Sequence, residues 1–314
     1  MSPYILRRLL VALLLMLGVA SLVFVVIHLI PGDVASIIVG ERATPEQVAN
    51  VRRALGLDRP LAIQYLDWLS KVARGELGNS LVSGRPVMDD LALQLPRTVE
   101  LMVSALWIAV IIGIPTGILA AVRRGSSTDL VVSTLGLMGL SVPSFVVGTL
   151  LALILGVYLR WLPISGFVPF GEDPAHHLKL LVMPSVALGL SMAGVVMRMT
   201  RSAMLEVLGE DYIRTARAKG MAERIVRYRH ALRNAVIPVV SVVGVQAGTL
   251  LGGTVIIEFI FNWPGLSSLL IRGIFQRDAP LVQGVILLIS GAFIVINLLV
   301  DVVNARLDPR IRYG

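Results

Sequence analysis

The sequence EDYIRTARAKG at residues 210–220, followed by MAERIVRYRHALRNAVIP at residues 221–238, is a polar interruption between two long apolar runs. Across 201–233 the chain carries eight Lys or Arg residues, whereas most other links between apolar runs are brief. In the first part acidic residues lead and basic residues follow, which suits the helix dipole at both ends. Gly220 can take the left-handed conformation that ends a helix. We therefore expect a short helix before Gly220 and a second one from Ala222.

The composition indicates that the chain lies in a lipid bilayer. Of its 314 residues, 56% are hydrophobic and 15% charged, and the mean hydropathy is +0.82, which leaves too little polar surface for a soluble globule of this size. The net charge of +8 does not indicate nucleic acid, because the bases cluster between apolar runs and only 6% of residues are aromatic. The absence of cysteine excludes disulfides, thiolate metal sites and cysteine nucleophiles.

Six apolar runs are long enough to cross a hydrocarbon core of ~30 Å, which takes roughly 20 residues of helix. They are Leu9–Ile30, Thr98–Val122, Leu130–Leu159, Leu178–Met199, Ala235–Ile257 and Leu281–Val303. The first run is too long for a signal peptide and is expected to be retained. The third contains Pro143, which removes a backbone donor and predicts a kink or tilt. The sequence therefore predicts an all-α integral membrane protein with six transmembrane helices.

The distribution of Lys and Arg predicts which side of the membrane each link occupies. Both termini, the second link and the fourth link together carry 15 such residues, whereas the third and fifth links carry four. The first link has eight bases and eight acids over 67 residues, a length at which this rule loses force. We expect both termini to be cytoplasmic. The predicted organisation is a first helix at 1–30, an extracytoplasmic segment at 31–97, a five-helix core at 98–303 with a cytoplasmic loop at 201–235, and a cytoplasmic tail at 304–314.

The extracytoplasmic segment has two helix patterns. Thr44 is a good N-cap, Pro45 suits the first helical position and Gln47 completes a capping box. A second amphipathic helix is expected from Asp58 to near Gly75. These helices either lie on the membrane or a partner, or only cover the ends of the spans.

The short helix before Gly220 has two interpretations. One is a solvated basic link that obeys the charge rule. The other is a docking surface for another protein, because Tyr212, Ile213, Ala216 and Ala218 are small or apolar and have no reason to face water in so short a helix.

At these residues the sequence resembles the permease subunits of ABC importers in the bacterial inner membrane, in the branch that takes up dipeptides and oligopeptides. The resemblance rests on DYIRTARAKG, HALRNAVIP, HLIPGDVA, SVPSF, FNWPGL and LDPRIR, and it extends over nearly the whole chain. Gly220 and Ile237–Pro238 correspond to the family's cytoplasmic signature. Arg214 stands where that signature usually has Glu.

The resemblance implies a type I ABC importer permease fold and a role in importing short peptides. It also implies a second homologous permease, two ATP-binding subunits and an extracytoplasmic substrate-binding protein as partners. The helix before Gly220 would sit in a groove of an ATP-binding subunit. The residues of this expected ATPase-coupling contact are Asp211, Tyr212, Ile213, Arg214, Thr215, Ala216, Arg217 and Gly220. A bulky residue at Gly220 or Ala216 is then expected to uncouple ATP hydrolysis from uptake.

No catalytic residues or cofactors are expected on this chain. It has no G-x-x-x-x-G-K-[ST] phosphate loop, so ATP and Mg²⁺ would be bound by partner subunits. The H-E-x-x-H and G-x-S-x-G motifs of proteases and esterases are also missing. Two alternatives stay open: another cargo such as glutathione, nickel chelates or opines, or a self-sufficient secondary transporter. The spans contain no buried carboxylate relay, which argues against a proton-coupled secondary transporter.

Small and polar residues inside the spans suggest further sites. Gly244, Gly248 and Gly252 form a stripe along the fifth span that suits close helix packing, either within this chain or at a partner or the pathway. Gln246 is the most deeply placed polar residue there and faces either the pathway or a neighbouring helix. His28 and Asn297 are weaker candidates of the same kind.

The external end of the fifth span is a candidate gate, formed by Glu258, Phe261, Trp263 and Pro264. Its aromatic residues suit a membrane interface, and the segment is expected to turn back over the pathway. The pair His176–His177 is the nearest approach to a metal site, with Glu172 and Asp173 close by in sequence. No metal is expected, because adjacent histidines on a helix point apart.

Overall fold

The computed structural model describes residues 2–29, 44–54 and 56–307. Within these residues the regular elements are helices, apart from an isolated antiparallel bridge between Asn79 and Pro86. The prediction of an all-α protein is confirmed. Most of the expected tail at 304–314 and the first part of the expected segment at 31–97 lie outside the described residues.

Five helical runs in the described chain are long and apolar enough to cross a membrane, and a bent pair of helices brings the number to six if it forms one span. The five runs are α1 (Ser2–Leu29), α5 (Val87–Val122), α8 (Pro174–Leu208), the run Glu223–Gly253 that ends in α11 (Leu232–Gly253), and α14 (Ala279–Leu307). Each contains all or most of one of the predicted apolar runs.

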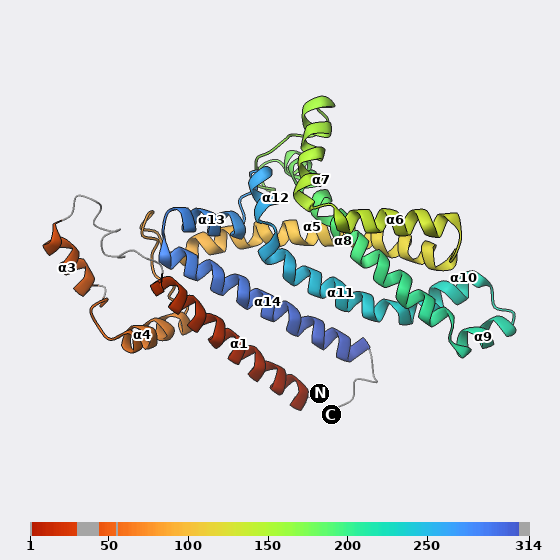
Figure 1. Cartoon of the computed structure of the whole chain (residues 1–314), viewed down its shortest axis with the longest axis horizontal. Coiled ribbons are helices and arrows are strands. Elements are labelled where there is room, and N and C mark those ends of the chain that lie inside the picture. Colours follow the sequence, from red (N-terminus) through yellow and green to blue (C-terminus); the bar gives the residue numbers. More distant parts are fainter. Residues whose placement is uncertain (1, 30–43, 55, 308–314) are drawn as a thin grey trace. The chain divides into compact units, whose positions relative to one another are not determined.

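The predicted third span is broken at Pro143. It consists of α6 (Ser127–Ser141), α7 (Ser144–Leu151) and the π-helix η1 (Ala152–Tyr158), and the two parts meet at 97°. Figure 1 shows α7 turning steeply away from α6. Val142 and Pro143 both have extended backbone angles, with ψ of 121° and 139°, because the residue before a proline avoids the helical region. The predicted kink is thus a sharp break.

The chain divides into two units, of which the first comprises Met1–Thr98 and Pro264–Ile294. It contains α1, α3 (Pro45–Ala54), α4 (Leu61–Ala73), α13 (Leu266–Phe275), the first turns of α5 and most of α14. Its core is formed by Val87, Leu91, Leu266, Leu269, Leu281 and Val285. On α4, Tyr65 places its hydroxyl 2.8 Å from Ser21 Oγ of α1 and its ring against Phe24.

The capping box predicted at Thr44 is confirmed. The Thr44 N–H donates to Gln47 Oε1 at 2.9 Å, and the Gln47 N–H donates to Thr44 Oγ1 at 3.3 Å. The next helix begins at Leu61 rather than Asp58, because the extended Pro60 precedes it. Helix α5 begins at Val87, well before the predicted start of its span at Thr98.

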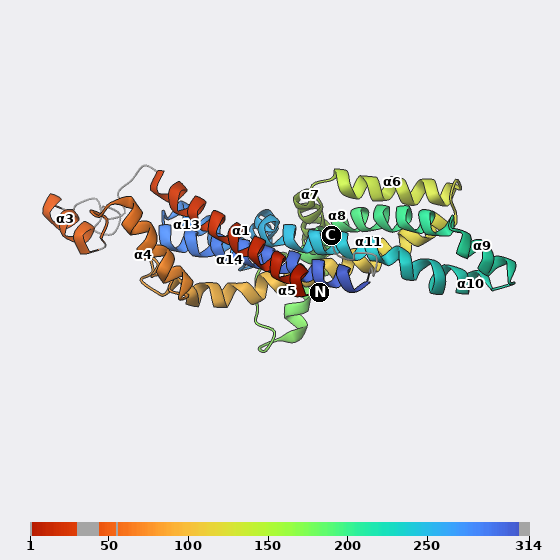
Figure 2. The ribbon, with the colours of Figure 1, turned by 90° about the horizontal axis from the view of Figure 1, so that it is seen from below.

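The second unit comprises Val99–Trp263 and Val295–Gly314, and α8 is its central helix. Helices α6, α7 and α11 all pack on α8, and Figure 2 shows α6 lying alongside it. Glycines allow the closest approaches: a Cβ atom on Gly113 or Gly117 of α5 would collide with α8, as would one on Gly136 of α6. Small residues at such crossings let helix backbones touch.

The basic segment forms α9 (Asp211–Ala218), α10 (Glu223–Ile225) and the π-helix η2 (Val226–Ala231). Gly220 has φ +75° and ends α9 as predicted. The second basic helix is not separate, because α10, η2 and α11 form one continuous run. Helix α11 ends at Gly253, and the last residues of the predicted fifth span belong to a separate helix, α12 (Val255–Ile260).

Candidate functional site

Helix α9 lies between the end of α8 and the beginning of α10. Only Gly209 and Glu210 separate it from α8, and Glu210 is its N-cap. Figure 1 shows α9 and α10 beyond the ends of α8 and α11. The chain changes direction between two spans at α9, and α9 is connected to both.

The inner face of α9 packs against the chain's own core. Ile213 is 0% exposed and Ala216 is 7% exposed. The core cluster around them contains Ile118, Ala121, Ala203, Met204, Val226, Ala231 and Ala235. The expectation that Ile213 and Ala216 face a partner is therefore wrong. A bulky residue at Ala216 would disturb this cluster rather than a partner's groove.

The outer face of α9 is polar and exposed. Asp211, Arg214, Thr215 and Ala218 follow one another at the spacing that places residues on one side of a helix, and all four are exposed. The Asp211 and Arg214 side chains are 94% and 73% exposed and form an ion pair at 3.3 Å. Such an exposed pair contributes little to stability, so this face is available to another protein.

Polar contacts tie α9 to the beginning of the next run. Asn234 Nδ2 donates to the Tyr212 hydroxyl at 2.7 Å, and that hydroxyl donates to the His230 carbonyl oxygen at 3.4 Å. Arg217 Nε donates to Glu223 Oε1 at 2.7 Å. Of the expected coupling residues, Tyr212 and Arg217 are thus partly engaged within this chain, and Gly220 is exposed at the end of the helix.

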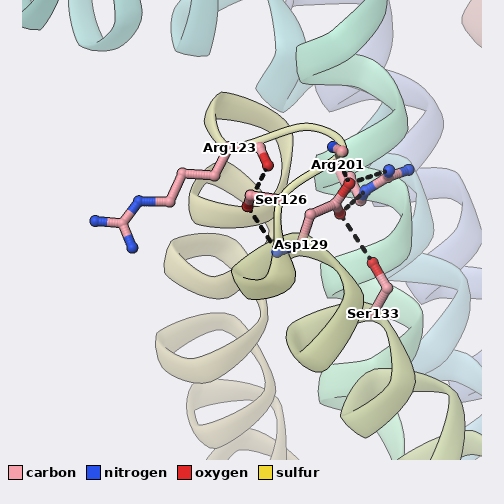
Figure 3. Close-up of polar contacts among 6 residues, drawn as sticks. Arg123, Ser126, Asp129, Ser133 and Arg201 are labelled. Carbon is pink, nitrogen blue, oxygen red and sulfur yellow. Dashed lines mark hydrogen bonds and ion pairs between the residues drawn. The ribbon is translucent and has the colours of Figure 1, made fainter.

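Sequence reasoning missed an ion pair on α8, the helix that leads into α9. Asp129 at the start of α6 accepts two hydrogen bonds from Arg201 of α8, at 2.8 Å and 2.9 Å (Figure 3). Ser126 caps α6 by accepting from the Asp129 N–H at 3.3 Å. The sequence SSTD at residues 126–129 is a capping pattern, and a carboxylate so near an apolar run is costly unless paired. Both signals could have drawn attention to Asp129.

The candidate gate at the far end of α11 is packed inside the chain. Phe261 and Trp263 are buried, so their rings pack on residues of this chain, and their place at a membrane interface stays a prediction. Glu258 is also buried, and Thr254 Oγ1 donates to its Oε1 at 2.8 Å. The turn through Asn262, at φ +48°, brings the Trp263 N–H within 2.8 Å of the Glu258 carbonyl oxygen. Pro264, which follows, is half-buried.

A buried histidine lies near the same aromatic residues. His177 Nδ1 is 2.6 Å from the Val168 carbonyl oxygen, and Nε2 is 2.7 Å from Glu100 Oε1. Its ring packs edge-on against Phe167 and Trp263. A neutral imidazole has one N–H, and on either ring nitrogen that N–H would have an oxygen acceptor within hydrogen-bond distance.

No metal site is found in the described part of the chain, where no three His, Asp or Glu residues gather in one place. His176 is exposed, whereas its neighbour His177 is buried. Adjacent histidines therefore point to different surroundings, as predicted from their position on a helix.

The three glycines of the stripe on α11 have different surroundings, so they do not form one contact surface. A Cβ atom on Gly244 would collide with Val300 of α14, whereas one on Gly252 would meet no atom within 4 Å. Gly248 is buried. Gln246 is half-buried, and its side-chain amide makes no hydrogen bond to any described residue. Packing within this chain explains Gly244 and leaves Gln246 and Gly252 as candidates for the pathway or a partner.

Comparison with known proteins gives the class and the family. Residues 113–313 match the family "binding-protein-dependent transport system inner membrane component", and residues 1–102 match the N-terminal region of such membrane components. A chain of the inward-facing MetNI methionine ABC transporter has the same fold, with a TM-score of 0.59 and 19% identity over 70% of this chain and 97% of its own. The protein is a membrane-spanning permease of an ABC importer.

Full-length relatives narrow the branch. The chain is 45% identical to the glutathione transport system permease GsiC of Salmonella typhimurium and 43% identical to GsiC of Escherichia coli K12. It is 41% identical to the probable peptide ABC transporter permease y4tP of Sinorhizobium fredii. Each match covers 100% of both chains. The chain belongs to the binding-protein-dependent inner membrane components, in the peptide and glutathione branch.

Proposed function

We propose that this permease imports short peptides, with glutathione included in that class, and that α9 receives the movement of an ATP-binding subunit. The importer would contain a second, similar permease, two ATP-binding subunits that hold ATP and Mg²⁺, and an external binding protein. ATP hydrolysis would take place on the ATP-binding subunits, and this chain would form half of the pathway.

The two-faced character of α9 is the observation that supports the contact. Its inner face is anchored in a core that α5, α8 and the α10–α11 run share. Its outer face presents Asp211, Arg214, Thr215 and Ala218. A force applied to that outer face would reach the spans directly, because packed side chains do not yield easily.

Bulky substitutions on the outer face test this proposal. We expect Thr215→Trp and Ala218→Trp to leave the assembled importer intact and to lower uptake per ATP hydrolysed by about tenfold, since coupling free energies are typically 1–3 kcal/mol. The assay is the purified importer in proteoliposomes with its binding protein. Ala92→Trp is the control, because Ala92 is an exposed alanine of α5 in the other unit. Wild-type coupling in both α9 variants would contradict the contact.

The cargo proposal rests on the relatives, which are named for peptides and for glutathione, itself a tripeptide. Substrate selection is assigned to the binding protein. Mass spectrometry of the small molecules that co-purify with the cognate binding protein tests it. Dipeptides or glutathione are the expected result, and a metal chelate or opine would contradict the peptide class.

The distribution of charge supports the proposed orientation. Residues of α11 that are not fully packed within this chain support a second permease. The surplus of Lys and Arg at the termini and the 201–233 segment favours the cytoplasm for both. On α11, the Gln246 amide, which has no hydrogen bond to a described residue, and the open side of Gly252 are candidates for the shared pathway. Transport by this chain alone, driven by an ion gradient, would contradict the two-permease assembly.

A further inference from the structure

The ion pair between Asp129 and Arg201 joins α6 to α8 about two turns before α8 ends and leads into α9. Arg201 donates from Nε to Oδ1 and from Nη2 to Oδ2, the two-pronged geometry that makes arginine pairs strong and directional (Figure 3). Ser133 Oγ donates to the same carboxylate at 3.2 Å, and the Gly125 N–H at 3.0 Å. Asp129 is only 6% exposed, and its oxygens are well supplied with donors.

A second contact between α6 and α8 lies two helical turns away. A Cβ atom on Gly194 would collide with the backbone oxygen of Gly136, so the two backbones touch there. Gly136 follows Asp129 by seven residues, and Gly194 precedes Arg201 by seven. The helices therefore run antiparallel, and the two contacts are about 10 Å apart along the axis. Two contacts at this separation resist both sliding and rotation of α6 on α8.

Helix α5 is held to the same part of α8. A Cβ atom on Gly117 would collide with the backbone oxygen of Met197 and with Thr200. The turn between α5 and α6 is bound as well, because the Gly125 N–H donates to Asp129. Three helices and their connecting turn thus meet around residues 194–201 of α8, and α8 continues for about two turns to Leu208 before α9 begins at Asp211.

We propose that Asp129 and Arg201 are positioning residues for energy coupling. The pair fixes α6, and with it the turn from α5, to the part of α8 that carries α9, so that a displacement of α9 moves the three helices together. Neither residue contacts nucleotide or cargo in this role. The inference rests on the proposed contact between α9 and an ATP-binding subunit.

A purely structural role would have a different signature. An ion pair that only stabilises the fold would, when broken, lower the amount of assembled importer and leave uptake per ATP unchanged in the complexes that form. A positioning pair changes that ratio in assembled complexes. The ratio per assembled complex is therefore the informative measurement.

The test compares Arg201→Gln and Asp129→Asn with wild type in the complete reconstituted importer. Uptake of radiolabelled glutathione, and in parallel of radiolabelled dialanine, is measured together with ATP hydrolysis with and without binding protein. We expect uptake per ATP to fall by about tenfold and basal hydrolysis to stay within about twofold of wild type. Arg201→Lys keeps the charge but not the two-pronged contact, and is expected to fall between wild type and Arg201→Gln.

Two controls complete the experiment. Arg198→Gln removes an exposed arginine from the same helix, one turn earlier, and is expected to behave as wild type. The double variant Asp129→Asn/Arg201→Gln is expected to be no worse than either single variant, because both act through one contact. Wild-type ratios in Arg201→Gln, or an equal loss in Arg198→Gln, would overturn the positioning role.

Thr215→Trp, measured in the same assay, separates this inference from the proposed function. If Thr215→Trp uncouples and Arg201→Gln does not, the positioning role is wrong and the α9 contact stands. If Thr215→Trp and Ala218→Trp both keep normal coupling, the α9 contact itself is wrong, whatever Arg201→Gln does.

Discussion

Buried polar residues in this chain keep their place through specific hydrogen bonds. His177 illustrates this, because both of its ring nitrogens face oxygen acceptors, one on Val168 and one on Glu100. Removing the ring leaves the carbonyl oxygen of half-buried Val168 and the half-buried Glu100 carboxylate without these partners. An unsatisfied buried polar group costs about 1–3 kcal/mol.

We expect His177→Phe to destabilise the protein by about 1–3 kcal/mol, because phenylalanine fills a similar space but donates no hydrogen bond. Thermal unfolding of the purified importer in detergent should show a lower melting temperature. His176→Phe is the matched control, since His176 is the exposed neighbour on the same helix. Equal effects of the two substitutions would show that the hydrogen bonds of His177 do not stabilise the protein measurably.

Gly244 and Gly252 provide a second comparison of single residues. We expect Gly244→Ala to destabilise by about 1–3 kcal/mol, because its Cβ would collide with the stiff, β-branched Val300. Gly252→Ala should be neutral or stabilising by about 0.5–1 kcal/mol, since open space surrounds it. Unfolding measurements on both variants check this, and the double variant Gly244→Ala/Val300→Ala should recover part of the loss.

The contact partners of single residues were the hardest feature to predict from the sequence. The periodicity around Ile213 and Ala216 predicts an apolar face on a short helix, but not which protein covers it. That depends on Met204 and Val226, residues from other helices that meet α9 only in the folded chain. Asp129 and Arg201 are 72 positions apart, and no local pattern connects them.

At the scale of elements, α9 is held mainly by apolar burial. Ile213 is fully buried, whereas Glu223 and its partners Arg217 and Arg227 are partly exposed. We expect Ile213→Ala to cost about 2–5 kcal/mol, seen as a large drop in assembled importer or melting temperature. Glu223→Gln should cost less than about 1 kcal/mol, because water screens exposed pairs. The reverse order would mean that ion pairs, not burial, hold α9.

Helix ends set by local chemistry were predictable, and those set by packing were not. The capping box of Thr44 and the left-handed Gly220 follow from neighbouring residues, and both were found. The early start of α5 at Val87 was missed, because bilayer thickness limits the apolar run but not the helix. Pro143 predicted a kink, but the 97° angle between the two parts of the span depends on the packing of α7 on α8 and α12.

For the whole molecule, hydropathy predicted the membrane class and the long apolar helices, because bilayer insertion depends on composition more than on detailed contacts. The family was predicted from motifs such as DYIRTARAKG and FNWPGL. The orientation remains a prediction, and the chain is well suited to testing it because it has no cysteine. We expect a membrane-impermeant maleimide to label Val82→Cys in spheroplasts and to label Thr215→Cys only after permeabilisation. Both positions are exposed. Labelling of Thr215→Cys from outside would contradict the orientation.

Contact between α9 and an ATP-binding subunit is the central claim, and cross-linking tests it most directly. A benzophenone-maleimide attached to Thr215→Cys or Ala218→Cys, in an importer whose other subunits lack cysteine, should yield an adduct with an ATP-binding subunit on illumination. The same probe at Val82→Cys should not. Mass spectrometry of the adduct identifies the partner. An adduct from Val82→Cys, or none from either α9 position in assembled and active complexes, would contradict the account.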